Sequence, residues 1–142
     1  MVITSTGAVK AVSKALPELD GKLTGNAIRV PTPNVSLAVM SLTVDKNDLS
    51  KDGVNEFLRK TAFNSKYREI VGFVNSTEIV SSDFYSSPFA SVIDSQATIV
   101  SDNKITLYCW YDNEYGYSVQ VVNLVKNIAG INLIRLPVKV WY

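Results

Sequence analysis

Apolar residues recur along the chain with two different periods, and these periods predict helices and strands. Helical spacing is found in three segments, which are residues 7–16, 50–62 and 116–129. Alternating or continuous apolar runs predict strands over residues 28–30, 35–44, 70–74, 77–84, 88–93, 97–100 and 105–111. Helices together with several consecutive strands are typical of an antiparallel-rich sheet with helices against it. The pattern therefore predicts an α+β fold.

The ends of the three predicted helices carry residues that commonly start or stop a helix. Pro17 ends the first helix, Ser50 caps the second, and Gly130 closes the third. The second helix is predicted to turn one apolar face inward, made of Val54, Phe57, Leu58 and Ala62.

The longest predicted strand, residues 35–44, is apolar on both faces. One face holds Val35, Leu37 and Val39, and the other holds Ala38, Met40, Leu42 and Val44. We therefore expect both faces to be covered, by helices or by a partner subunit. A mostly apolar tail with Trp141 follows Gly130 and is interpreted as a further strand, with a reading-frame artefact as the alternative. This divides the chain into a domain of residues 1–130 and a C-terminal tail of residues 131–142.

Composition narrows the classes of function. The 142 residues are 46% hydrophobic and 19% charged, as in an ordinary globular domain, and the net charge of +1 favours neither nucleic acid nor a membrane surface as partner. No apolar run reaches the roughly 20 residues of a membrane helix, and no secretory signal opens the sequence. One cysteine fits a reducing compartment, which suggests the cytoplasm. The absence of histidine excludes imidazole catalysis and histidine metal ligation within these residues, and no metal site is expected.

Thr6 and Gly7 form the best candidate anion site. They stand at the start of the first predicted helix, where free backbone N–H groups and the helix dipole favour negative charge. The alternative is a simple helix cap, which is the commoner role of threonine at this position.

Arg29 is the candidate for binding a phosphate group. It lies between two apolar residues just before a Pro-Thr-Pro turn, and its planar guanidinium can hold a phosphate with two hydrogen bonds. The alternative is a solvated surface charge or an ion pair.

Residues 110–118, Trp-Tyr-Asp-Asn-Glu-Tyr-Gly-Tyr-Ser, join the last strand to the last helix. Polar groups at such a corner lie at the rim of a sheet, where α/β proteins often place ligands. The Asn113 amide offers a donor and an acceptor that match a carboxamide. Alternatively, Asp112 and Asn113 only cap the helix, and Tyr117 only packs on the core.

This corner closely resembles that of glyceraldehyde-3-phosphate dehydrogenases and their erythrose-4-phosphate sibling. Two other stretches agree in order and spacing, Thr-Ser-Thr-Gly-Ala-Val-Lys-Ala-Val at residues 4–12 and the segment from Leu16 to Ser36 with its Arg-Val-Pro-Thr-Pro-Asn string. The resemblance covers residues 1–130 and is greatest to the longer bacterial forms. It implies part of the catalytic C-terminal domain, a mixed, antiparallel-rich sheet with helices on one face, and neighbouring subunits on the other.

The resemblance also implies roles for individual residues. Thr6 and Gly7 match the pair that binds the attacking inorganic phosphate, and Arg29 matches the arginine that contacts the phosphate of the aldehyde substrate. Asn113 matches the residue that holds the nicotinamide carboxamide of NAD or NADP, with Tyr117 near the same ring. The loop after residues 81–84 lacks the basic or histidine-containing pattern of many relatives, so its anion contact is not expected here.

No catalytic residue is predicted in the chain. Cys109 alternates with Leu107 in an apolar strand, where a thiol is an inert hydrophobe with a raised pKa. The nucleophilic cysteine of the resembling family, its activating histidine and its Gly-rich dinucleotide-binding segment match nothing in these residues.

Two hypotheses follow for the function. In the first, the chain is part of an NAD(P)-dependent phosphorylating dehydrogenase, works with a separate dinucleotide-binding segment, and forms a homo-oligomer. In the second, it is a stand-alone, non-catalytic module for oligomerisation or protein binding, descended from that domain.

Overall fold

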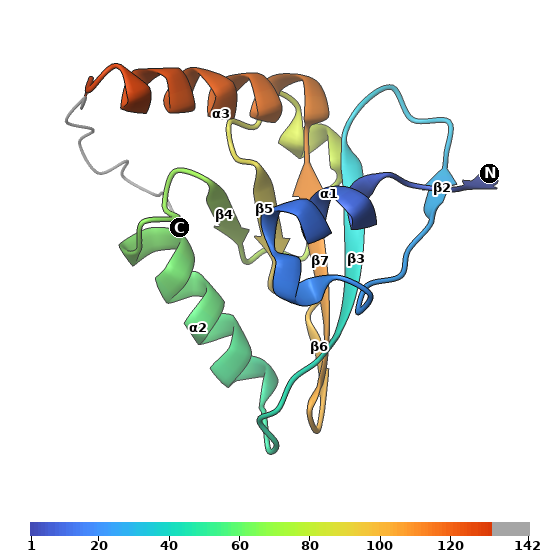
Figure 1. The fold of residues 1–142 in the computed structure, drawn as a ribbon. Helices are drawn as coiled ribbons and strands as arrows, with labels where there is room; N and C mark the ends of the chain where they lie inside the picture. Colours follow the sequence, from blue (N-terminus) through green and yellow to red (C-terminus); the bar gives the residue numbers. More distant parts are fainter. Residues whose placement is uncertain (132–142) are drawn as a thin grey trace. The chain divides into compact units, whose positions relative to one another are not determined.

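The computed structural model describes residues 1–131, which form two compact units, residues 1–33 and residues 34–131 (Figure 1). The described residues contain three α-helices and seven strands. None of these helices is long and apolar enough to cross a membrane. The predicted strand in the tail lies outside the described residues, apart from Ile131.

The first unit consists of a two-stranded sheet and a short helix. Strand β1, Val2–Thr4, pairs antiparallel with β2, Ala27–Arg29, so that Thr4 lies opposite Ala27. Helix α1, Ala8–Ala15, ends just before Pro17, and the one-turn 3-10 helix η1, Pro17–Leu19, follows. The predicted helix and the strand near residues 28–30 are confirmed. Strand β1 was not predicted, because a pair of apolar residues is too short to show a period.

The second unit is built on a five-stranded sheet with the order β3-β7-β5-β4, in which β6 also pairs with β7. The strands are β3, Ser36–Thr43; β4, Val71–Val74; β5, Ser91–Asp94; β6, Ile99–Ser101; and β7, Lys104–Tyr111. All pairs are antiparallel except β4 with β5. The predicted α+β class with a mixed, antiparallel-rich sheet is therefore confirmed.

One face of this sheet packs against helix α2, Lys51–Asn64. The core on this face consists of Ile93, Ile105, Leu107 and Cys109, against which Val54 and Leu58 of the helix pack. The predicted cap is confirmed, since the Ser50 hydroxyl accepts a hydrogen bond from the Gly53 N–H at 3.1 Å. The inward placement of Phe57 is wrong, because its side chain is 67% exposed. Each helical residue turns by about 100°, which carries Phe57 away from the line of Val54 and Leu58.

The other face carries a smaller cluster around Val35, Phe84 and Val92. The Trp110 ring stacks on Phe84, with ring centroids 5.3 Å apart. The predicted strand over residues 77–84 is wrong, since residues 81–84 form a 3-10 helix, η2. The Asp83 carboxylate accepts a hydrogen bond from the Val80 N–H at 2.8 Å, and such local bonds compete with a strand ladder.

Helix α3, Asn113–Ile128, lies across one end of the sheet in Figure 1. It begins three residues before the predicted start at Gly116, which is buried against the loop before β5. A Cβ at Gly116 would stand 2.6 Å from the Phe89 carbonyl oxygen, so this close approach requires glycine. Gly130 closes the helix as predicted, with φ of +69°. Much of the apolar side of α3 is exposed, at Val121, Val122, Leu124, Val125 and Ile128.

Candidate functional site

The first turn of α3 is held by the buried carboxylate of Asp112. Its Oδ1 accepts a hydrogen bond from the Tyr115 N–H at 3.1 Å, which caps the helix. Its Oδ2 accepts hydrogen bonds from the Ser86 N–H at 2.9 Å and from Nδ2 of Asn34 at 3.1 Å. The capping alternative is therefore confirmed for Asp112. Asn113 is the first residue inside the helix and does not cap it.

These donors also determine the protonation of Asp112. The backbone N–H groups of Tyr115 and Ser86, helped by the Asn34 amide, lower the pKa of the carboxyl below its ordinary value of 3.8. Folding therefore favours the ionised form of the Asp112 carboxyl.

We expect this group to contribute to acid unfolding. Because the folded pKa lies below the unfolded one, the Asp112 carboxylate stabilises the fold above about pH 4, and the contribution is lost as the pH falls through the folded pKa. Asp112→Asn should lower the urea midpoint at neutral pH and flatten its fall under acid. Urea unfolding at a series of pH values measures both. An unchanged pH dependence in the variant would contradict the assignment.

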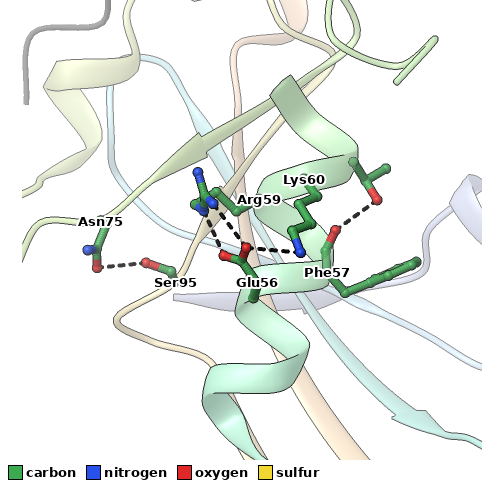
Figure 2. A network of polar contacts seen from close by, with 7 residues as sticks. Glu56, Phe57, Arg59, Lys60, Asn75 and Ser95 are labelled. Carbon is green, nitrogen blue, oxygen red and sulfur yellow. Dashed lines mark hydrogen bonds and ion pairs between the residues drawn. The ribbon is translucent and has the colours of Figure 1, made fainter. Parts of the chain in front are cut away.

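Glu56 on α2 is the matched control for that measurement. Figure 2 shows its carboxylate paired with Arg59 at 2.8 Å and with Lys60 at 3.3 Å, and its pKa is lowered to about 2, mainly by the hydrogen bond from Arg59. All three side chains are at least 44% exposed, so salt should screen this network, whereas the hydrogen bonds of the buried Asp112 should persist. Glu56→Gln in high salt should therefore leave the pH dependence nearly as in the unchanged chain.

Asn113 and Tyr117 lie one turn apart at the start of α3. This i, i+4 spacing places them on the same side of the helix. Both are exposed, Tyr117 to 72%, so the alternative that Tyr117 packs on the core is wrong. No residue within 1–131 hydrogen-bonds the Asn113 side chain, which leaves its amide available to a ligand.

Thr6, Gly7 and Arg29 all belong to the first unit. The Ala8 N–H donates a hydrogen bond to Oγ1 of Thr6 at 3.2 Å, and Gly7 occupies the N-cap position of α1. The first turn of α1 contains no acidic side chain, so no carboxylate of that turn competes with an anion. A Cβ at Gly25 would lie 3.3 Å from Val9 and 3.9 Å from Thr6, so the segment that leads into β2 passes beside the start of α1.

Arg29 is exposed at the end of β2. Its Nε donates a hydrogen bond to Oγ1 of Thr4 at 3.4 Å. This contact orients the guanidinium from one side and leaves its two terminal nitrogens for another acceptor. Sequence reasoning missed Thr4, whose only signal was its place in the run of small polar residues before Gly7.

Cys109 is 3% exposed, and burial raises the pKa of its thiol, opposed by a hydrogen bond with Ser91. The predicted burial and raised pKa of this thiol are confirmed. Among residues 1–131, no three His, Cys, Asp or Glu side chains gather in a way that could hold a metal ion.

The structure thus brings the predicted residues together in two groups. Thr6, Gly7 and Arg29 lie in the first unit, and Asn113 and Tyr117 lie on one turn of the second. Residues 1–113, which include all of these except Tyr117, match the family described as glyceraldehyde 3-phosphate dehydrogenase, C-terminal domain. The chain belongs to this family.

Sequence identity to curated relatives also places the chain in the glyceraldehyde-3-phosphate dehydrogenase family. A glyceraldehyde-3-phosphate dehydrogenase-like protein of Pseudomonas aeruginosa is 54% identical over 137 residues, which are 96% of this chain and 30% of the relative. The chloroplastic GAPB enzyme of Arabidopsis thaliana is 47% identical over 130 residues, 91% of this chain and 29% of the relative. Glyceraldehyde-3-phosphate dehydrogenase 2 of Bacillus subtilis is 44% identical over 133 residues, 91% of this chain and 37% of the relative. The chain spans about a third of the length of these relatives.

Proposed function

We propose that this chain forms part of an NAD(P)-dependent phosphorylating glyceraldehyde-3-phosphate dehydrogenase, which oxidises an aldehyde phosphate to an acyl phosphate. The observation that carries the proposal is the family match over residues 1–113, which includes both candidate phosphate-binding positions and Asn113. The chain would supply the phosphate-binding and carboxamide-binding walls of the active site. Other segments would supply the nucleophilic cysteine, the histidine and most of the dinucleotide site.

In this proposal Thr6 and Gly7 bind inorganic phosphate. The open space around Gly7 lets an anion approach the backbone at the start of α1, where the helix dipole is positive. The Thr6 hydroxyl accepts from Ala8 and can donate its own proton to a phosphate oxygen. The Thr6 hydroxyl can therefore accept from the Ala8 N–H and donate to an anion at the same time.

Arg29 would bind the phosphate group of the aldehyde. Its exposed guanidinium, oriented through Nε by Thr4, presents a fixed fork that suits a dianionic phosphate. Binding at both phosphate positions would orient the substrate and the attacking phosphate relative to the reacting carbon.

Asn113 would hold the carboxamide of the nicotinamide, with the Tyr117 ring one turn away. The exposed amide fits this group because each partner offers one donor side and one acceptor side. When bound, the nicotinamide supplies the hydride acceptor, and Asn113 fixes the orientation of its ring. The sequence contains no Gly-rich phosphate-binding turn, so the rest of NAD or NADP would be bound elsewhere. We place the enzyme in the cytoplasm on the basis of its single cysteine, although the relative from Arabidopsis is chloroplastic.

The exposed apolar side of α3 supports a second candidate function, a non-catalytic module for oligomerisation or protein binding. Retention of specific anion binding at Thr6 and Arg29 discriminates between the two, because a binding module has no need of it.

A phosphate titration of the labelled chain tests the enzyme proposal. We expect backbone amide shifts first at Thr6, Gly7 and Ala8, with a dissociation constant no tighter than about 1 mM, or about 4 kcal/mol, because the site lacks its partner residues. Thr6→Val should weaken the response at these amides, and Arg29→Ala should remove any response around β2. Arg59→Ala is the matched control, since it removes an exposed arginine that already pairs with Glu56. If the three amides stay still while others shift, they form only a helix cap.

A further inference from the structure

Asp112 connects three segments that are distant in sequence. Its two carboxylate oxygens accept hydrogen bonds from the segment just before β3 through Asn34, from the loop after η2 through Ser86, and from the first turn of α3 through Tyr115. The side chain is 3% exposed, although it lies next to the exposed Asn113. A buried carboxylate that accepts three hydrogen bonds is therefore the immediate neighbour of an exposed polar side chain.

The backbone is strained in the two segments that donate to Asp112 from outside α3. Val35 has φ of +69° although it is β-branched, and Ser86 has φ of +58°. Such conformations persist only where the surroundings enforce them, and they concentrate at functional sites. Here the enforcing contacts are visible, because Asn34 Oδ1 accepts from the Val35 N–H at 2.7 Å while its Nδ2 donates to Asp112, and the Ser86 N–H donates to the same carboxylate.

The rest of α3 is held independently of Asp112. Gly116 lies against the Phe89 carbonyl, and Nε2 of Gln120 donates hydrogen bonds to the Pro88 carbonyl at 3.0 Å and the Glu69 carbonyl at 3.2 Å. The helix therefore has two separate attachments, one behind its first turn and one along its next two turns. Loss of the first should loosen the first turn without detaching the helix.

We propose that Asp112 is a positioning residue, which fixes the first turn of α3 so that the Asn113 carboxamide is oriented for the carboxamide of nicotinamide. This inference rests on the proposed function, in which Asn113 contacts nicotinamide. It concerns a residue that does not itself touch the ligand. Its role requires a carboxylate, because three donors converge on it and an amide has only one acceptor oxygen.

Asp112→Asn is therefore the informative variant. If its amide oxygen caps Tyr115, its NH₂ group faces the donors of Ser86 and Asn34, and if the amide is flipped, the helix loses its cap. The matched control is Glu56→Gln, which removes the same charge from an exposed network on α2.

The test uses the labelled 142-residue chain and nicotinamide itself as the probe. In the unchanged chain and in Glu56→Gln, nicotinamide should shift the Asn113 side-chain amide along a saturable curve. In Asp112→Asn the affinity should fall by about tenfold or more, since small misplacements of a binding group are costly. Unchanged chemical shifts of the Leu107 and Cys109 backbone amides in β7 would show that the sheet is intact in the variant. Equal affinity in Asp112→Asn and the unchanged chain would overturn the proposal.

A second measurement needs no ligand. We expect the scalar couplings of Asn113 to show one χ1 rotamer in the unchanged chain and rotamer averaging in Asp112→Asn, with faster hydrogen exchange at the Tyr115 N–H. A single rotamer in the variant would overturn the positioning role whatever binds there. If the unchanged chain shows one rotamer but no response to nicotinamide, the nicotinamide contact fails, and with it the ligand named in this proposal.

Discussion

The 142-residue chain is expected to reduce no NAD or NADP when it is supplied with glyceraldehyde 3-phosphate and inorganic phosphate. Covalent catalysis of this reaction needs an activated thiolate with a base beside it. The sequence contains no histidine, and its one thiol, Cys109, is buried with a raised pKa. A spectrophotometric assay of cofactor reduction measures the activity directly.

The control for this assay is Cys109→Ser. Because Cys109 packs among Ile93, Ile105 and Leu107, the substitution should change stability but no rate. Any trace of turnover should be the same in both chains and should therefore come from a contaminant. Turnover by the unchanged chain that disappears in Cys109→Ser would show that the buried thiol is the nucleophile.

The chain is also expected to self-associate, most simply as a symmetric dimer through the face of the sheet opposite α2. Leu37, Val39 and Ile99 lie on this face and are 40%, 55% and 55% exposed. Their neighbours on β7 are Trp110, Tyr108 and Thr106, so the exposed side chains form one apolar surface. Monomers rarely leave contiguous apolar patches larger than a few hundred Å² exposed, and a two-fold dimer buries the same patch on both copies.

Sedimentation velocity over a range of micromolar concentrations measures this association. Val39→Lys places a charge at the centre of the patch and should weaken the dimer by about 2 kcal/mol or more, as for a central interface residue. Leu124→Lys is the control on the exposed side of α3, and an effect of this variant alone would place the interface on that helix. A chain that remains monomeric at every concentration would contradict the exposed-sheet argument.

Elements that depend on local pattern were predicted well from the sequence. The continuous apolar run over residues 35–44 predicted β3, the alternation over residues 105–111 predicted β7, and Ser50 predicted the start of α2. The errors have local or tertiary causes. Residues 77–84 carry enough apolar positions for a strand, but the carboxylate of Asp83 closes a turn there. Gly116 suggests a helix boundary, whereas it allows α3 to approach the Phe89 carbonyl.

The candidate site was predictable only in part. Thr6 and Arg29 are recognisable because their chemistry is local, although their separate roles came from the resemblance to the family. The convergence on Asp112 was not predictable, because it depends on strand register. Ser36 pairs with Tyr111, and continuing this antiparallel register brings Asn34 beside the end of β7, where it meets Asp112. No spacing within one segment contains that information.

A chimera tests the central claim, that this chain supplies the phosphate-binding wall of a dehydrogenase site. The chimera starts from glyceraldehyde-3-phosphate dehydrogenase 2 of Bacillus subtilis, which matches this chain at 44% identity over 133 residues. The matching segment of that enzyme is replaced by the corresponding residues of this chain. We predict that the chimera oxidises glyceraldehyde 3-phosphate, and that Arg29→Ala lowers its kcat/KM by about tenfold or more, as for the loss of a charged hydrogen bond of about 1.5–3 kcal/mol. Arg59→Ala in the same chimera should have no such effect. A folded chimera that is inactive, or one that is equally active with and without Arg29, would contradict the claim.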